Sequence, residues 1–181
     1  MILEKRLNKT LKTYRLLFLV ASLVILLDQI TKAIIRAAIP FGGRWMPLDW
    51  LMPYFRFVHW ENTGAAFGLF QGGGLIFGIL AVVVSIFIVI YYRQIPQDEK
   101  LMRVAIAMQM GGALGNLIDR IVFGPVTDFI SVGNFPVFNI ADSSITVGVG
   151  LLILALWLDE RKTKDDEMNL LEQSEVMDDQ R

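Results

Sequence analysis

The sequence predicts an all-α polytopic membrane protein with four transmembrane helices and a small extracytoplasmic loop subdomain that is β-prone. Hydrophobic residues make up 54% of the 181 residues and charged residues 19%, whereas an average soluble domain is roughly 45 to 50% apolar and about 25% charged. Four segments approach the roughly 20 apolar residues that a helix needs to cross a bilayer. The prolines, which break helices, all fall between these segments: Pro40, Pro47, Pro53, Pro96, Pro125 and Pro136.

Each span follows from its apolar run. The first begins near Leu16 with LLFLVASLVILL, and charges enter only in its later half. The second is the clearest, because the 31 residues from Asn62 to Tyr92 include no Asp, Glu, Lys or Arg. We expect a single four-span domain, 1–164, followed by a tail, 165–181. The expected spans are about 16–39, 74–92, 102–121 and 142–158, with outer loops 40–73 and 122–141.

Lys and Arg are concentrated on one side of these spans. An even number of spans places both chain ends on the same side, and short cytoplasmic flanks are enriched in Lys and Arg. That side holds eleven of them: Lys5, Arg6, Lys9, Lys12, Arg15, Arg93, Lys100, Arg103, Arg161, Lys162 and Lys164. The opposite loops hold only Arg44 and Arg56. Both termini are therefore expected in the cytoplasm.

The long outer loop and the C-terminal tail differ in amino-acid composition. The loop is rich in aromatic residues, and its segment 54–60, YFRFVHW, predicts a short strand or hairpin. An ordinary aromatic belt at the membrane interface is the alternative interpretation of this composition. From Asp159 onward the chain has nine acidic and four basic residues and no aromatic ones, which is typical of a solvated or disordered tail.

Charged residues inside the first span need an explanation, because they are costly in a bilayer and usually carry function or are paired. Asp28, Lys32 and Arg36 recur every four residues, which places them on one helix face. Asp28 lies roughly 18 Å into its span, level with Asp119, roughly 22 Å along the third span. We expect a shared polar cavity, although an Asp28–Lys32 ion pair that only makes the span tolerable is an equally good explanation.

The third span contains GGALGNLIDR, residues 111–120. Gly111 and Gly115 form a pair of small residues four apart, which by itself indicates close helix packing. Asn116 shares a helix face with Asp119, three residues on, and with Arg120, four residues on. This face carries polar groups into the expected cavity.

Two further acids, Asp128 and Asp142, are expected at the outer boundary of the membrane. The third span runs outward, the fourth runs inward, and only 13 residues separate the two acids. Two carboxylates in one partly desolvated site do not easily ionise together, so the pair supplies a base and an acid for activating water against an amide. Taken singly, Asp128 is more simply a loop residue and Asp142 an N-cap before Ser143 and Ser144.

Five short blocks resemble bacterial lipoprotein signal peptidase, the signal peptidase II family, and they occur in family order between residues 28 and 142. The blocks are DQITK at 28–32, NTGAAF at 62–67, GGALGNLIDR at 111–120, VTDF at 126–129 and FNIAD at 138–142. The resemblance implies an intramembrane aspartyl endopeptidase of the bacterial cytoplasmic (inner) membrane, with its active site on the extracytoplasmic side. It would remove signal peptides from lipid-modified prolipoproteins, cutting before the diacylglyceryl-cysteine.

Carried over by motif, the catalytic pair would be Asp128 and Asp142. The resemblance also implies a set of substrate-binding or supporting residues: Asp28, Lys32, Asn62, Gly111, Asn116, Asp119, Arg120 and Asn139. The family uses no metal or organic cofactor, which agrees with the absence of Cys and with His59 as the single histidine. Membrane lipid and the cyclic peptide inhibitor globomycin are expected partners.

Two other classes of function also place acids within a membrane. An ion-coupled transporter would favour the bilayer midplane and repeated halves, and neither is evident in the sequence. A structural assembly subunit would explain the glycines and ion pairs, but not the two outer acids. No basic, aromatic-interleaved surface indicates nucleic acid binding.

Overall fold

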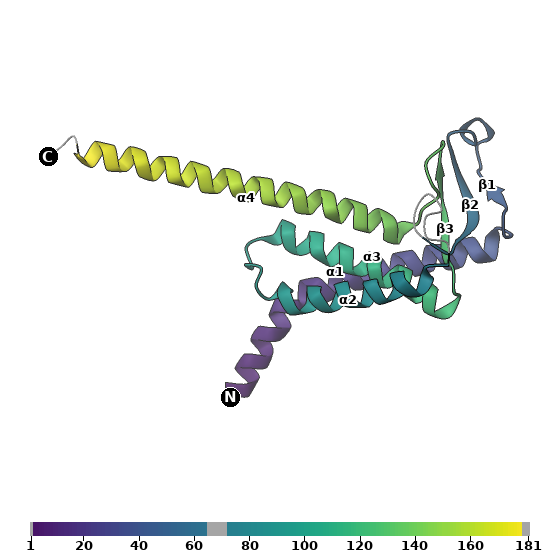
Figure 1. Ribbon diagram of the computed structural model, residues 1–181, viewed down its shortest axis with the longest axis horizontal. Helices are drawn as coiled ribbons and strands as arrows, with labels where there is room; N and C mark the ends of the chain where they lie inside the picture. Colours follow the sequence, from purple (N-terminus) through teal and green to yellow (C-terminus); the bar gives the residue numbers. More distant parts are fainter. Residues whose placement is uncertain (1, 65–71, 179–181) are drawn as a thin grey trace.

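Four long helices carry a small sheet at one end of the molecule (Figure 1). The computed structural model describes residues 2–64 and 72–178. The helices are α1 (Ile2–Ala38), α2 (Gly74–Tyr92), α3 (Lys100–Val122) and α4 (Ile140–Asp178). Each contains a stretch long and apolar enough to cross a membrane. The fold class predicted from the sequence is confirmed.

The first and last helices are longer than the apolar runs that predict them. α2 has the expected bounds, but α1 begins at Ile2 and α4 continues to Asp178. The added segments contain neither Gly nor Pro, and an ion pair of 2.6 Å joins Glu160 to Lys164 one turn along α4. The acidic segment therefore extends α4 as a helix beyond the rest of the bundle (Figure 1).

The sheet is antiparallel, with strand order β1-β2-β3. β1 (Arg44–Trp45) and β2 (Phe55–Asn62) come from the first outer loop, together with the short 3-10 helix η1 (Asp49–Leu51). β2 matches the expected strand. β3 (Val126–Val132) comes from the second outer loop, for which the sequence indicated no strand. Its register places Asp128 opposite Trp60.

α3 is the centre of the bundle and packs against the other three helices. Glycines make these approaches possible. A Cβ at Gly111 would lie 2.8 Å from Cβ of Val24 on α1, and one at Gly112 would lie 2.7 Å from Cγ1 of Ile145 on α4. The outward faces remain apolar and exposed, as on α2, where Leu75 is 76% exposed. This is the surface expected of helices solvated by lipid.

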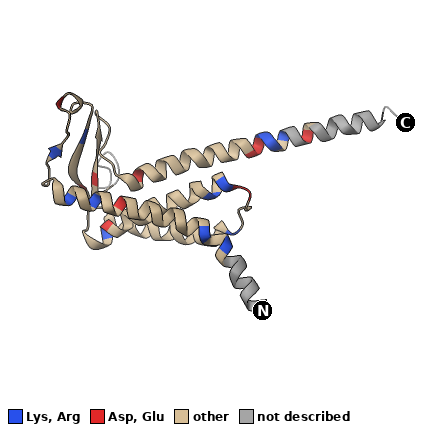
Figure 2. Ribbon diagram, turned by 180° about the vertical axis from the view of Figure 1, so that it is seen from behind, with Lys and Arg blue, Asp and Glu red and all other residues tan. Residues whose placement is uncertain are grey.

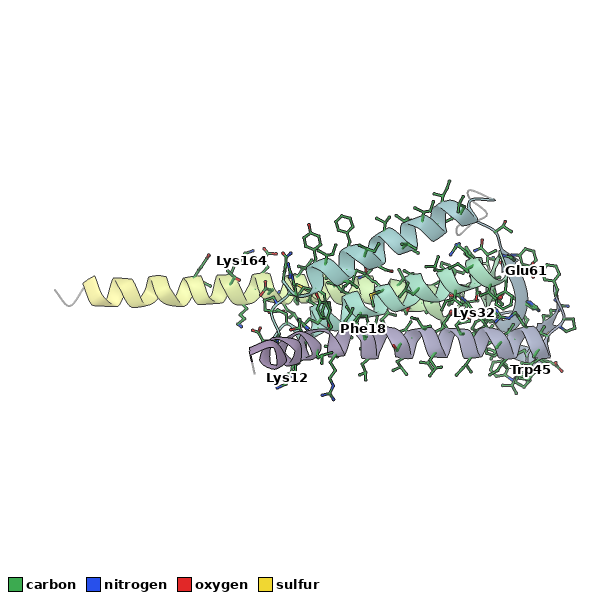
Figure 3. The ribbon with its side chains drawn as sticks, turned by 90° about the horizontal axis from the view of Figure 1, so that it is seen from below. Lys12, Phe18, Lys32, Trp45, Glu61 and Lys164 are labelled. Carbon is green, nitrogen blue, oxygen red and sulfur yellow. The ribbon has the colours of Figure 1, made fainter. Side chains whose placement is uncertain are left out.

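The basic residues that flank the spans and the aromatic residues of the sheet lie at opposite ends of the bundle. Arg93 follows α2 and Lys100 begins α3, so basic residues flank the connector between these helices, and Figure 2 shows further Lys and Arg on the distal part of α4, away from the sheet. In Figure 3, Lys12 and Lys164 lie toward one end and Trp45 and Glu61 at the other, with Lys32 between the helices near the sheet. The sheet therefore sits at the end that the Lys and Arg distribution predicts to be extracytoplasmic.

Candidate active site

Asp128 on β3 and Asp142 in the first turn of α4 share one neighbour, Asn139. The Asn139 side chain donates from Nδ2 to Oδ1 of Asp128 at 2.7 Å, and its backbone N–H donates to Oδ2 of Asp142 at 3.2 Å. Asn62 Nδ2 donates to the second Asp128 oxygen at 3.0 Å, and Asn116 Nδ2 donates to the second Asp142 oxygen at 2.7 Å. All four carboxylate oxygens thus accept a hydrogen bond from an amide N–H.

Asn139 also forms the cap of α4. Its Oδ1 accepts the Asp142 backbone N–H at 2.9 Å while Asp142 Oδ2 accepts the Asn139 N–H, which is the reciprocal arrangement of a capping box. The interpretation of Asp142 as the N-cap is therefore wrong. Asp142 is the third helical residue, and the cap itself holds its carboxylate beside Asn139.

The environment of Asp128 favours its protonated form. Asp128 is 1% exposed, and burial, reinforced by the nearby charge of Asp142, raises its pKa to about 7. The hydrogen bonds from Asn62 and Asn139 oppose this shift but do not cancel it. Asp128 therefore keeps its proton up to about neutral pH, as expected for a buried carboxyl group beside a second one.

Asp142 lines a cavity of about 530 Å³ between α2, α3, α4 and the segment that precedes α4. Much of the lining is apolar, including Phe77, Val126, Phe135, Phe138, Ile145 and Val147. Arg120 also lines it, with N–H groups 3.3 Å from the Asn116 carbonyl and 3.5 Å from the Gly64 carbonyl. The cavity thus combines an apolar surface with a carboxylate and a guanidinium.

A buried charge network lies behind the two aspartates. Lys32 Nζ is 2.8 Å from Asp28 Oδ2 and 3.2 Å from Asp119 Oδ2, and all three side chains are fully buried. Asp28 and Asp119 therefore lie close together, as their equal depths suggest, but through ion pairs to Lys32, and neither lines the cavity beside Asp142. Among the side chains that the structure describes, no three His, Asp or Glu gather as metal ligands; here a lysine lies between the acids.

The structure brings nearly all the expected site residues together. Asn62, Asn116 and Asn139 contact the two aspartates, and the network of Asp28, Lys32 and Asp119 adjoins them through Asn116. Gly111 instead packs against α1, as the helix-packing interpretation expects. The Ala65–Phe67 part of the second motif lies outside the described residues.

Three residues that contact the buried network were not predicted as site residues: Gln29, Arg36 and Thr127. Gln29 donates to both Asp28 and Asp119 at 3.1 Å, although it neighbours Asp28 in sequence and does not share its helix face. Thr127 bonds Asp119 through its backbone N–H and Arg36 through its hydroxyl. For Arg36, its place on the Asp28–Lys32 face was a usable signal.

Residues 20–158 match the family described as signal peptidase (SPase) II. The chain belongs to the signal peptidase II family. Its relatives include a lipoprotein signal peptidase of Syntrophotalea carbinolica, 41% identical over 156 residues, covering 82% of this chain and 95% of the relative. One from Staphylococcus aureus is 39% identical over 155 residues, covering 83% and 93%. The resemblance found in the five motifs is confirmed.

Two solved bacterial membrane enzymes, determined by the in meso method at 2.3 and 1.9 Å resolution, share the fold of this signal peptidase II. The first has a TM-score of 0.73 and 37% identity, and covers 80% of this chain and 88% of its own. The second has a TM-score of 0.69 and 38% identity, with 77% and 91% covered. As a member of this family the chain is an enzyme, an aspartic peptidase and a multi-pass membrane protein. This replaces the transporter and assembly-subunit interpretations.

Proposed function

We propose that this signal peptidase II removes signal peptides from lipid-modified prolipoproteins, cutting before the diacylglyceryl-cysteine, with Asp128 and Asp142 as its catalytic pair. The observation that carries the proposal is the pair of carboxylates held by Asn139 beside an apolar cavity. A signal peptide is an apolar segment already in the bilayer, and the mainly apolar lining suits such a chain. Curated relatives bear the name lipoprotein signal peptidase.

The two acids have different roles. Asp142 lines the cavity and lies in the first turn of α4, where the helix dipole favours negative charge. Asp128 is more deeply buried, and its raised pKa of about 7 keeps the proton on it. Asp142 is therefore the base that accepts a proton from the attacking water, and Asp128 is the acid that protonates the scissile carbonyl oxygen.

The cycle closes without any other proton donor. Attack of water on the carbonyl carbon gives a gem-diol, with one water proton on Asp142 and the original Asp128 proton on the former carbonyl oxygen. As the C–N bond breaks, Asp142 gives its proton to the leaving nitrogen and a gem-diol hydroxyl returns a proton to Asp128. Asp142 is again ionised and Asp128 protonated, so no metal or organic cofactor is required.

Of the two cations near the pair, Arg120 meets the substrate. Lys32 is fully buried, and its ammonium group already contacts Asp28, Asp119 and Asn116. Arg120 lines the cavity, and within the part of the chain that the structure describes its hydrogen bonds are long ones to two carbonyl groups. Its other N–H donors would bind a peptide carbonyl of the substrate.

The proposal includes a location in the bacterial inner membrane, with both termini in the cytoplasm and the active site on the extracytoplasmic side. The distribution of Lys and Arg supports this orientation, and so does the chemistry, since the lipid-bearing cysteine lies at the outer leaflet. Membrane lipid surrounds the spans, and globomycin inhibits the enzyme. Residues 1–164 form the catalytic unit, and 165–181 a cytoplasmic tail that it does not need.

Replacement of either aspartate tests the proposal. Asp128→Asn and Asp142→Asn keep the side-chain shape but remove the proton-transfer group, so each should lower kcat by roughly 10² to 10⁴-fold or more. The double variant should be hardly slower than either, because residues that act as a unit lose activity non-additively. Cleavage of a lipid-modified prolipoprotein by purified enzyme is the measurement.

The matched control is Asp49→Asn, which changes an exposed aspartate of η1 on the same side of the membrane. It should cleave at the wild-type rate. Substantial turnover by the Asp128 or Asp142 variant, at a normal level of folded protein, would rule out the two-carboxylate mechanism.

A further inference from the structure

The residue before each catalytic aspartate donates its backbone N–H to the side chain of a buried acid. Asp28 Oδ1 on α1 accepts the N–H of Ala141 at 2.9 Å, and Ala141 immediately precedes Asp142. Asp119 Oδ2 on α3 accepts the N–H of Thr127 at 2.9 Å, one residue before Asp128. Both acceptor side chains are 0% exposed. The same type of contact thus occurs once on α4 and once on β3.

Lys32 joins the two contacts. Its ammonium group has three N–H donors, and three acceptors surround it: Asp28 at 2.8 Å, Asp119 at 3.2 Å and Asn116 Oδ1 at 2.9 Å. Gln29 connects the same two acids a second time, at 3.1 Å to each. Figure 3 shows Lys32 lying between the helices, near the end that carries the sheet.

Asn116, the third acceptor, links Lys32 to the catalytic pair. Because Asn116 Oδ1 receives N–H groups from Lys32 and from Asn139, its Nδ2 must point the other way, where it donates to Asp142 Oδ1 at 2.7 Å. Lys32 therefore fixes the orientation of an amide that binds a catalytic carboxylate directly.

We propose that Asp28, Asp119 and Lys32 are positioning residues that together set the separation and orientation of Asp128 and Asp142. The inference rests on the proposed function of those two aspartates. Asp128 and Asp142 belong to separate elements, β3 and α4. The geometry of reacting groups must be held to about 0.5 Å. The buried acids fix both elements to one lysine, so the relative position of the carboxylates depends on a single rigid centre.

A purely stabilising ion pair is the competing explanation, and a charge-free variant separates the two. The triple variant Asp28→Leu, Asp119→Leu, Lys32→Met removes every charge of the trio, so no buried charge among them is left unpaired, and such replacements are often neutral for folding. It also removes both acceptors of the backbone N–H groups. The unsatisfied N–H groups and the loss of the Asp119 partner of Arg36, 3.8 Å away, should lower the unfolding temperature. Positioning further predicts that the folded fraction has kcat lowered by roughly 10²-fold and KM changed little.

Single variants add a rescue test. Asp119→Asn keeps an oxygen that can accept the Thr127 N–H, whereas Asp119→Ala does not, so the asparagine variant should recover part of the kcat lost in the alanine variant. The control is Arg103→Met, which removes a buried cation at the far end of α3 that donates to the Ile95 carbonyl at 2.9 Å. It should lower the unfolding temperature and leave kcat of the folded enzyme unchanged.

Wild-type kcat in the folded triple variant would overturn the positioning role. So would equal kcat values for Asp119→Asn and Asp119→Ala, which carry the test if the triple variant does not fold. Asp128→Asn is assayed in parallel: if it retains turnover, the proposed catalytic pair fails. If Asp128→Asn is inactive while the network variants keep wild-type kcat, only the positioning role fails.

Discussion

Asn139 uses three different atoms to hold the two aspartates. Its Nδ2 donates to Asp128, its Oδ1 accepts from the Asp142 backbone, and its own backbone N–H donates to the Asp142 carboxylate. Turning the amide over would lose the bond to Asp128 and the helix cap together, so only one orientation satisfies every partner. A single residue therefore caps α4 and fixes both carboxylates.

The pKa of Asp128 predicts how activity depends on pH. Because Asp128 must be protonated to act as the acid, kcat/KM should fall as the pH rises through about 7. The Asn62 N–H stabilises the ionised form of Asp128, so Asn62→Leu should raise the pKa and move this alkaline limb to higher pH. Measuring kcat/KM over roughly pH 5 to 9 for both enzymes tests this. A limb that stays in place or moves to lower pH would contradict the assignment.

How far the sequence predicts the site depends on whether a contact is local. The Asp28–Lys32 pair follows from i, i+4 spacing, and the depth of Asp119 follows from the helical rise. The bonds to the Ala141 and Thr127 backbones do not follow, because they depend on how closely α1 and α3 approach α4 and β3. Long-range hydrogen bonds of this kind leave no periodic signal.

The same division holds for the secondary structure elements. An apolar run of bilayer length is a property of one segment, so all four spans were predicted, with α2 in its observed bounds. β3 was missed because VTDFISV contains an acid at its third position. Its stability as a strand comes from pairing with β2, which lies 64 to 77 residues away along the chain for the pairs Asn62–Val126 and Phe55–Val132. The helix beyond residue 158 was missed because an acidic composition is typical of disordered tails. The absence of Gly and Pro from residues 159–178 favours the helix that forms there.

The contact between α3 and α4 predicts a difference between two glycines. A Cβ at Gly112 would meet Ser144 Oγ at 2.6 Å and Ile145 Cγ1 at 2.7 Å, and it would press on the Ala141 carbonyl next to Asp142. Gly112→Ala should therefore lower both the unfolding temperature and kcat. A Cβ at Gly150 meets nothing within 4 Å, so Gly150→Ala should be neutral or more stable by up to about 1 kcal/mol. Thermal unfolding in detergent and the cleavage assay measure both effects, and equal behaviour of the two variants would contradict this packing.

Across the whole molecule, the paired aspartates lie at the end opposite the basic residues that flank the connector between α2 and α3. The aspartates lie where the helices meet the sheet, whose exposed aromatic residues include Trp45 at 53% and Trp60 at 54% exposure. Arg93 and Lys100 flank the connector between α2 and α3 at the other end. Aromatic residues favour the membrane interface, and Lys and Arg favour the cytoplasmic side. The orientation of the whole molecule therefore decides which leaflet the active site faces.

Single cysteines test that orientation, because the native chain has no Cys. Trp50, in η1, is 70% exposed and belongs to the outer loop, so Trp50→Cys should react with a membrane-impermeant maleimide in intact cells. Gln97, in the exposed connector between α2 and α3, should react as Gln97→Cys only after the membrane is opened. Both variants should keep cleavage activity, which shows that the labelled protein is folded. Labelling of Gln97→Cys from outside would invert the topology and move the aspartates to the cytoplasmic side, where the lipid-bearing cysteine of a translocated prolipoprotein does not lie.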